Sequence, residues 1–173
     1  MTIRILVADD HKLFRQGLIS LMLTHDDLVE VVGEAATGNE AVQMAARLQP
    51  DVVLMDIYMP DGDGLQATRE ICSRFPKIAV VMLTSSEADE HLYEAVRLGA
   101  SGYLLKSLDA EELFSLITGV MRGEAAMTRV MAVDLAVHNI RVNVIAPGPI
   151  DVARSRKPVR GLRATRRATR LAR

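Results

Sequence analysis

The chain has 173 residues, which is enough for one substantial hydrophobic core. Hydrophobic residues make up 49% of it, which excludes a disordered chain, and it contains no apolar run long enough to cross a bilayer. The net charge of −1 conceals two unlike parts: residues 151–173 carry nine Lys or Arg and one acid, a net +8, whereas residues 1–150 carry 12 basic and 21 acidic residues, a net −9.

Two features of the sequence indicate where in the cell the protein is expected. Cys72 is the only cysteine, so an intramolecular disulfide is impossible and the cytoplasm is the expected location. The first residues, MTIRILVADD, lead directly into a charged strand end and do not have the pattern of a signal peptide.

Five apolar runs alternate with segments of helical spacing over the first 124 residues. The runs predict strands at 3–8, 29–33, 52–57, 78–83 and 102–105. The third helix is expected to stop before Pro76, the fourth at a C-capping Gly99, and the fifth near Gly123. This alternation predicts an α/β fold with a five-stranded, parallel, doubly wound sheet of strand order 2-1-3-4-5.

Residues 125–173 follow a different pattern. Residues 125–150 predict a helix to about His138, a strand over Ile140–Ala146 and a Pro/Gly turn. Residues 151–173 are Arg-rich and are expected to be disordered on their own. We therefore expect three segments: a domain at 1–124, a helix–strand extension at 125–150 and a basic tail at 151–173.

Carboxylates close two of the predicted strands. Asp56 interrupts the apolar run VVLMDIYMP, and Asp9 and Asp10 end the run IRILVADD. Strands apolar on both faces lie inside a parallel sheet, and their carboxyl ends meet at the edge where such folds bind ligands. Three acids gathered there need a cation or shifted pKa values. Mg²⁺ suits this set, with direct ligation by Asp10 and Asp56, a water-mediated role for Asp9, and the backbone carbonyl of Tyr58 as a further ligand.

Two more polar residues end predicted strands. Lys106 follows GYLL and can place a positive charge on a phosphoryl oxygen, and Thr84 ends VVMLT with a hydroxyl donor. A carboxylate can act as the nucleophile toward phosphorus, which makes this a candidate phosphoryl-acceptor site. The alternative is that the three acids are helix caps and loop acids and that Lys106 is solvated. The four histidines, including His11, lack metal-ligand spacing and are expected at the surface or in caps.

Four short motifs resemble the receiver domain of bacterial two-component response regulators. They are DDH at 9–11, MDIYMPDGDGL at 55–65, LTS at 83–85 and GYLLK at 102–106. FRQGL at 14–18 and the LLKS ending are similar to the NarL-type subfamily, whose output domain is a LuxR-type helix-turn-helix. The resemblance covers residues 1–124 and implies a flavodoxin-like receiver fold.

The resemblance also implies roles for single residues. It makes Asp56 the phospho-acceptor for a histidine kinase or phosphotransfer protein, and Asp9 and Asp10 the pair that serves Mg²⁺. Thr84 and Lys106 would sense the phosphoryl group, with Tyr103 as an aromatic switch, although plain core packing explains Tyr103 equally well. Tyr58 and Ser86, two residues after Asp56 and Thr84, would tune the lifetime of the phosphoryl group.

No helix-turn-helix pattern follows residue 124. Instead, residues 128–152 are similar to a late helix and strand of short-chain dehydrogenases, most clearly in NIRVNVIAPGPI. Dehydrogenase activity is not expected, because the first strand lacks a Gly-rich dinucleotide turn and the chain has no Tyr-x-x-x-Lys pair. A fusion, a recombination scar and an artefact of gene assembly are each consistent with such a fragment.

These patterns favour a signalling receiver over an enzyme. Its output is expected through protein contacts, including homodimerisation, and not through a membrane or specific DNA. The alternative is a transcription regulator that binds DNA through its basic C-terminal segment. That segment has no aromatic residue, since none follows Phe114, so base stacking is not supported and at most weak, salt-sensitive nucleic-acid binding is expected.

Overall fold

A computed structural model describes residues 2–85, 89–107 and 109–123. The helix predicted to end near His138, the strand Ile140–Ala146 and the basic tail all lie outside these residues. None of the helices within the described ranges has the length and apolarity that crossing a membrane requires.

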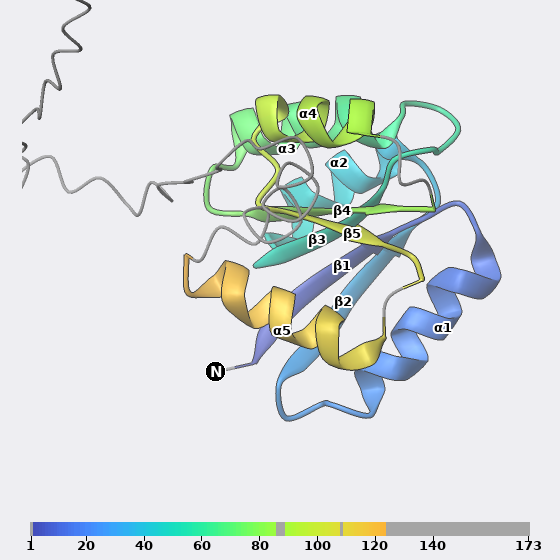
Figure 1. The fold of residues 1–173 in the computed structure, drawn as a ribbon, viewed down its shortest axis with the longest axis vertical. Coiled ribbons are helices and arrows are strands. Elements are labelled where there is room, and N and C mark those ends of the chain that lie inside the picture. Colours follow the sequence, from blue (N-terminus) through green and yellow to red (C-terminus); the bar gives the residue numbers. More distant parts are fainter. Residues whose placement is uncertain (1, 86–88, 108, 124–173) are drawn as a thin grey trace, which may run out of the picture.

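The described residues form one five-stranded parallel sheet with the order β2-β1-β3-β4-β5 (Figure 1). This confirms the predicted fold and strand order. The apolar runs locate every strand to within two residues at each end. The strands are β1 (Ile3–Ala8), β2 (Val29–Ala35), β3 (Val52–Asp56), β4 (Ala79–Thr84) and β5 (Gly102–Leu105).

Helices cover both faces of the sheet. Helices α2, α3 and α4 lie on one face, and α1 and α5 lie on the other (Figure 1). Their bounds are α1 (Lys12–Leu23), α2 (Gly38–Leu48), α3 (Gly64–Arg74), α4 (Asp89–Leu98) and α5 (Ala110–Met121). The sheet is therefore buried on both sides, as its continuous apolar strands require.

The central strand β3 divides its side chains between two hydrophobic cores. Val53 and Met55 pack in the core that includes Ile71 of α3. Val52 and Leu54, which alternate with them, pack in the core that includes Ile117 of α5. All five residues of β3 are buried, so Asp56 at its end is held by packing on both faces.

Side-chain caps and one left-handed glycine set the ends of several helices. Thr37, Asp63 and Asp109 each accept a hydrogen bond from the backbone N–H three residues ahead, at the starts of α2, α3 and α5. Gly99 follows α4 with φ of +94°, which confirms its predicted capping role. These caps use acids other than Asp9, Asp10 and Asp56, so the capping explanation does not account for those three carboxylates.

Candidate functional site

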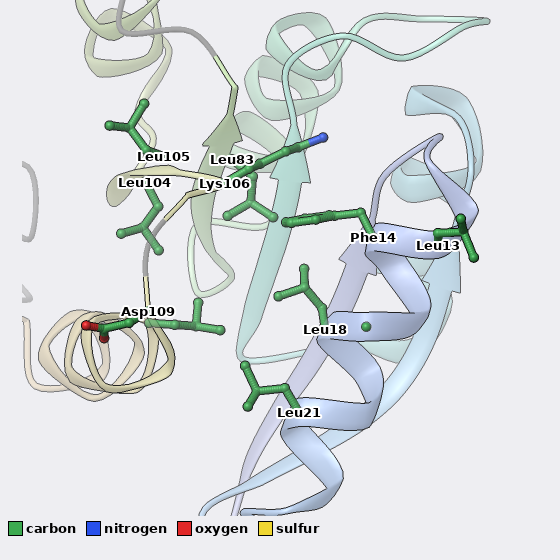
Figure 2. A pocket seen from close by; sticks show the side chains of 11 residues that line it. Leu13, Phe14, Leu18, Leu21, Leu83, Leu104, Leu105, Lys106 and Asp109 are labelled. Atoms are coloured by element: carbon green, nitrogen blue, oxygen red, sulfur yellow. The ribbon is translucent and has the colours of Figure 1, made fainter.

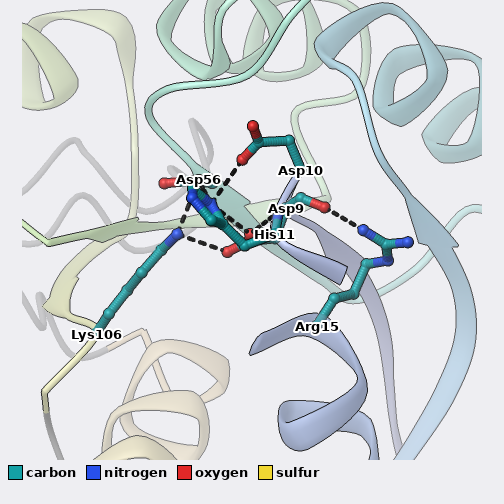
Figure 3. Close-up of polar contacts among 6 residues, drawn as sticks. All are labelled: Asp9, Asp10, His11, Arg15, Asp56 and Lys106. Atoms are coloured by element: carbon teal, nitrogen blue, oxygen red, sulfur yellow. Dashed lines mark hydrogen bonds and ion pairs between the residues drawn. The ribbon is translucent and has the colours of Figure 1, made fainter. Parts of the chain in front are cut away.

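Four strands bring polar residues to one edge of the sheet. Asp9 directly follows β1, Asp56 ends β3, Thr84 ends β4 and Lys106 directly follows β5. Because the strands are parallel, all four positions lie at the carboxyl edge, as predicted. Figure 3 shows Asp9, Asp56 and Lys106 pointing toward one another, with Asp10 beside them.

The carboxylates differ in burial. Asp9 and Asp56 are 0% and 2% exposed, whereas the side chain of Asp10 is 33% exposed at the mouth of the cluster. The backbone N–H of His11 donates to Asp9 Oδ1 at 2.8 Å, and the Arg15 guanidinium donates to the Asp9 carbonyl. Two buried acids thus form the floor of the site, and the first turn of α1 holds Asp9 in place.

Lys106 supplies the positive charge among these acids. Its Nζ lies 2.8 Å from Asp9 Oδ2 and 2.8 Å from Asp56 Oδ2. The backbone N–H of Lys106 donates to the carbonyl of Thr84 at 2.6 Å, which ties the residue to the end of β4. The ammonium therefore bridges the ends of β1 and β3 from a position next to β5.

Lys106 also lines an apolar groove beside the cluster of acids. The groove has a volume of about 380 Å³ and lies between α1 and the start of α5. Figure 2 shows Phe14, Leu18 and Leu21 extending from α1 into it, opposite Leu104. Lys106 Nζ lies 4.8 Å from the centre of the Phe14 ring, within the range of a cation–π contact. Phe14 thus helps to keep the ammonium over the two acids, a contact that its helical spacing alone did not reveal.

Burial and neighbouring charge change the acidity of the central groups. Burial raises the pKa of Asp56, and the charges of Asp9 and Asp10 raise it further, against the opposing effect of Lys106. Burial alone would lower the pKa of Lys106, but its hydrogen bonds and ion pairs with Asp56 and Asp9 raise it overall. The site therefore contains more negative charge than one ammonium balances.

The donor set fits a divalent cation. Asp9, Asp10, His11 and Asp56 each offer one ligand atom, and these atoms all lie within 4.8 Å of one another. Three of the four donors are carboxylate oxygens, which are the ligands that Mg²⁺ prefers. The excess negative charge and the raised pKa of Asp56 are both features that a bound cation would relieve.

His11 is a residue of this cluster that sequence reasoning missed. Its Nδ1 lies 2.8 Å from Asp10 Oδ1, 3.5 Å from Asp9 Oδ1 and 3.9 Å from Asp56 Oδ2. The expectation that His11 lies at the surface or in a cap is confirmed, because it is the N-cap residue of α1 and its side chain is 69% exposed. Spacing along the chain did not indicate that its imidazole would lie near Asp56, which another strand supplies. The only available signal was its position directly after the two acids.

Tyr58 makes a contact that its sequence position does not indicate. Tyr58 is 53% exposed, and its hydroxyl lies 2.5 Å from Nε2 of His91 on α4, with the two rings nearly perpendicular. The loop after Asp56 is thereby joined to α4. The role of the Tyr58 carbonyl as a cation ligand stays a prediction.

The predicted switch residues are both buried. Thr84 is 0% exposed, and Tyr103 is 4% exposed in the core that α4 also contacts. Tyr103 pairs with Met82 across β4 and β5, two residues from the end of each strand. Ser86, the other residue expected to tune phosphoryl lifetime, lies outside the described residues.

A family model matches the chain over most of the described fold. Residues 5–118 match the model of the response regulator receiver domain. The chain belongs to the response-regulator receiver family. This confirms the resemblance drawn from the DDH, MDIYMPDGDGL, LTS and GYLLK motifs, and it identifies the chain as part of a two-component signalling system.

Individual relatives place the receiver near the LuxR-output subfamily. The chain is 42% identical over 125 residues to the response regulator protein VraR of Staphylococcus aureus, a match that covers 72% of this chain and 59% of VraR. The signal receiver domain of a NarL response regulator from Mycobacterium tuberculosis has 33% identity and a TM-score of 0.67, covering 70% of this chain and 98% of that one. A LuxR-family response regulator from Aurantimonas sp. SI85-9A1 has 32% identity and a TM-score of 0.73, covering 80% and 99%.

A second, partial match concerns the C-terminal part. Residues 118–171 match the model of an enoyl-(acyl carrier protein) reductase, which agrees with the similarity of residues 128–152 to short-chain dehydrogenases. Of this stretch, the structure describes only residues 118–123 at the end of α5. The curated relatives over the rest of the chain are named as response regulators. The boundaries predicted at 124 and 150 stay predictions.

Proposed function

We propose that this receiver accepts a phosphoryl group on Asp56 from the phosphohistidine of a histidine kinase or phosphotransfer protein. The observation that carries the proposal is the position of the Asp56 carboxylate. It is buried, it lies at the end of the central strand, and its Oδ2 lies 2.8 Å from the ammonium of Lys106. An oxygen of Asp56 forms a bond to phosphorus while the phosphorus–nitrogen bond of the donor breaks.

Asp9, Asp10 and Asp56 would hold Mg²⁺ in this proposal, with the carbonyl of Tyr58 as a further ligand. The cation neutralises charge on the carboxylates and on the transferred group. Lys106 already lies against Asp56, so its ammonium can remain beside that residue and pair with a phosphoryl oxygen. Thr84, at the end of the neighbouring strand, would donate its hydroxyl to another phosphoryl oxygen.

Thr84 and Tyr103 would carry the conformational change from Asp56 to the surface of the domain. A new hydrogen bond to the phosphoryl group would draw Thr84 toward Asp56 and change the packing around Tyr103. Because Tyr103 is 4% exposed, the change would be a rearrangement among buried groups on the side of α4, β5 and α5. An unchanged NMR environment of Tyr103 after phosphorylation would contradict this switch.

Output through contacts with other proteins, including a second copy of the chain, is the form of signalling we propose. DNA binding through the basic C-terminal segment is the alternative, and one observation favours it: a structural relative from Staphylococcus aureus is described as a DNA-binding response regulator of the LuxR family. The chain spans 59% of the length of VraR, so the output of a whole regulator is not carried over from that match. Sequence-specific retention of DNA at physiological salt would support the alternative, whereas weak retention lost on adding salt would reflect only the basic residues 151–173.

Intact mass spectrometry tests the phosphoryl-acceptor role. The full chain is incubated with Mg²⁺ and acetyl phosphate, beside an Asp56→Ala variant. We expect one phosphoryl group on the unmodified chain and none on the variant. Absence of the mass increase in a folded chain that binds Mg²⁺ would contradict the proposal, and so would an equal increase in the variant.

A further inference from the structure

We propose that His11 is a ligand of the divalent cation bound by this site and that its imidazole makes the site favour Co²⁺, Ni²⁺ or Zn²⁺ over Mg²⁺. The proposal rests on the proposed function insofar as Asp9, Asp10 and Asp56 hold the cation. It adds a nitrogen donor to a set of oxygen donors, and it concerns which cation the site selects.

The position of the imidazole matches that of a ligand. Around an octahedral cation with ligands at about 2.1 Å, adjacent ligand atoms lie about 3.0 Å apart and opposite ones about 4.2 Å apart. Nδ1 of His11 lies 2.8, 3.5 and 3.9 Å from one oxygen each of Asp10, Asp9 and Asp56 (Figure 3). These three distances span the range from adjacent to opposite ligands, and the four ligand atoms all lie within 4.8 Å of one another, so small side-chain movements would let one cation contact all four residues.

Helix capping does not explain this position. His11 is the N-cap residue of α1, yet its side chain makes no capping hydrogen bond. Its backbone N–H is instead bound to Asp9 Oδ1 at 2.8 Å, which fixes the residue next to the buried acid. The imidazole is thus directed at the acids and not at the free N–H groups of the helix.

The exposed residues of the cluster leave a path by which a cation can reach the buried ones. The side chain of His11 is 69% exposed and that of Asp10 is 33% exposed, whereas Asp9 and Asp56 are almost completely buried. A hydrated cation can therefore meet His11 and Asp10 first and exchange its remaining waters for the buried carboxylates. Imidazole nitrogen suits Co²⁺, Ni²⁺ and Zn²⁺ far better than Mg²⁺, which retains oxygen ligands and water.

An ordinary ion pair between His11 and the acids predicts the opposite result. In that case the imidazole would compete with any cation for the carboxylates, and its removal would strengthen the binding of every divalent cation. If the imidazole is instead a ligand, its removal affects the two cations differently. Co²⁺ binding becomes weaker, whereas Mg²⁺ binding is almost unchanged or slightly stronger.

Calorimetric titration of the full chain with Co²⁺ and with Mg²⁺, at one fixed pH, separates the two cases. His11→Ala is compared with the unmodified chain and with His25→Phe, which removes another histidine but keeps a ring against Phe114. We expect His11→Ala to weaken Co²⁺ binding about tenfold and to change the visible absorption of bound Co²⁺, with His25→Phe unaffected. Equal or tighter Co²⁺ binding by His11→Ala would overturn the proposal, as would a chain that binds no Co²⁺.

The phosphoryl-acceptor role is judged separately on the unmodified chain. If that chain takes up no phosphoryl group but its Co²⁺ affinity depends on His11, the proposed function fails and the cation site stands. If it is phosphorylated in Mg²⁺ but its Co²⁺ affinity does not depend on His11, only the role of His11 fails.

Discussion

Lys106 and Asp56 are 50 residues apart in the chain, and Nζ of the first lies 2.8 Å from Oδ2 of the second. The same ammonium lies 2.8 Å from Asp9 Oδ2, so one charge is shared between two buried carboxylates. Asp10 adds a third negative charge at the mouth of the cluster. The arrangement is electrostatically incomplete, and this imbalance determines how the site should respond to mutation, pH and cations.

Asp56→Asn should stabilise the cation-free protein at neutral pH. Burial, together with Asp9 and Asp10, raises the pKa of Asp56 above its value in the unfolded chain, so the folded state disfavours the charged form. Removing that charge should raise the free energy of unfolding by roughly 1 kcal/mol and the melting temperature by about 4 °C.

The sign of the pH dependence follows from the same raised pKa. The folded wild-type protein holds the proton of Asp56 more tightly than the unfolded chain does, so the cost of ionisation is absent at low pH and appears as pH rises through the folded pKa. The advantage of Asp56→Asn should therefore shrink on acidification. Urea unfolding in EDTA at several pH values measures this, and a variant less stable than wild type at pH 7 would contradict it.

Lys106→Met should have the opposite effect. Methionine keeps an apolar side chain beside Phe14 but leaves Asp9 and Asp56 without their shared ammonium. Without divalent cations, the free energy of unfolding should fall by roughly 2–3 kcal/mol, because buried charges lose their partner. Mg²⁺ should restore part of the loss and bind more tightly than to wild type.

Lys77→Met is the matched control, since Lys77 is an exposed lysine that precedes β4. It should change neither stability nor cation affinity appreciably. Thermal melts with and without Mg²⁺ compare the three proteins. Weaker Mg²⁺ binding by Lys106→Met than by wild type would show that the ammonium does not oppose cation binding in this cluster.

The pattern of hydrophobic residues predicts the sheet because the packing of those residues in the core determines where the strands lie. β3 is buried at all five positions, and a strand of that kind can lie only inside a sheet covered on both faces. Strand order and parallel direction then bring the ends of β1, β3 and β5 to one edge, so the proximity of Asp9, Asp56 and Lys106 could be predicted. Their chemical roles remain proposals.

Side chains at the surface of the site could not be predicted in the same way. The imidazole of His11 lies near three acids, one of which comes from another strand, and the contact between Tyr58 and His91 joins residues 33 apart. Neither leaves a periodic pattern in the sequence. Backbone conformation shows the same division: the left-handed Gly99 was predictable, whereas the left-handed Gln49 and Asp61 were not, because side chains at those positions normally oppose positive φ.

Two glycines should respond oppositely to a methyl group. A Cβ on Gly64 would lie 1.7 Å from the carbonyl oxygen of Asp56, so Gly64→Ala must displace the backbone at the end of β3. We expect a loss of roughly 2–3 kcal/mol in the free energy of unfolding and slower phosphorylation by acetyl phosphate.

Gly17 provides the contrast. It lies within α1, and a Cβ there would meet nothing within 4 Å. Gly17→Ala should therefore stabilise the protein by about 0.5–1 kcal/mol through helix propensity. Urea unfolding of both variants tests the pair, and equal stability of Gly64→Ala and wild type would mean that the loop after β3 yields to the added methyl group without cost.

Cys72 should be unreactive in the folded protein even though it is the only cysteine. Burial raises the pKa of its thiol to about 11, and its Sγ donates to the carbonyl of Gly99 at 3.4 Å. Only about 0.1% of a thiol with that pKa is thiolate at pH 8, and thiolate is the reactive form. Alkylation by iodoacetamide at pH 8 should be about 100-fold slower than in the urea-unfolded chain. The rate should rise about tenfold per pH unit until the pH approaches the thiol pKa.

The same raised pKa affects stability at alkaline pH. The unfolded chain loses the Cys72 proton near its ordinary pKa of 9.0, while the folded protein keeps it until about pH 11. Stability due to the protonated thiol is therefore complete below pH 9 and declines as the pH rises toward 11, and Cys72→Ala should remove this part of the decline. Native and unfolded alkylation rates that agree within a few fold at pH 8 would show that α3 exposes the thiol through frequent local opening, and that its burial does not control its chemistry.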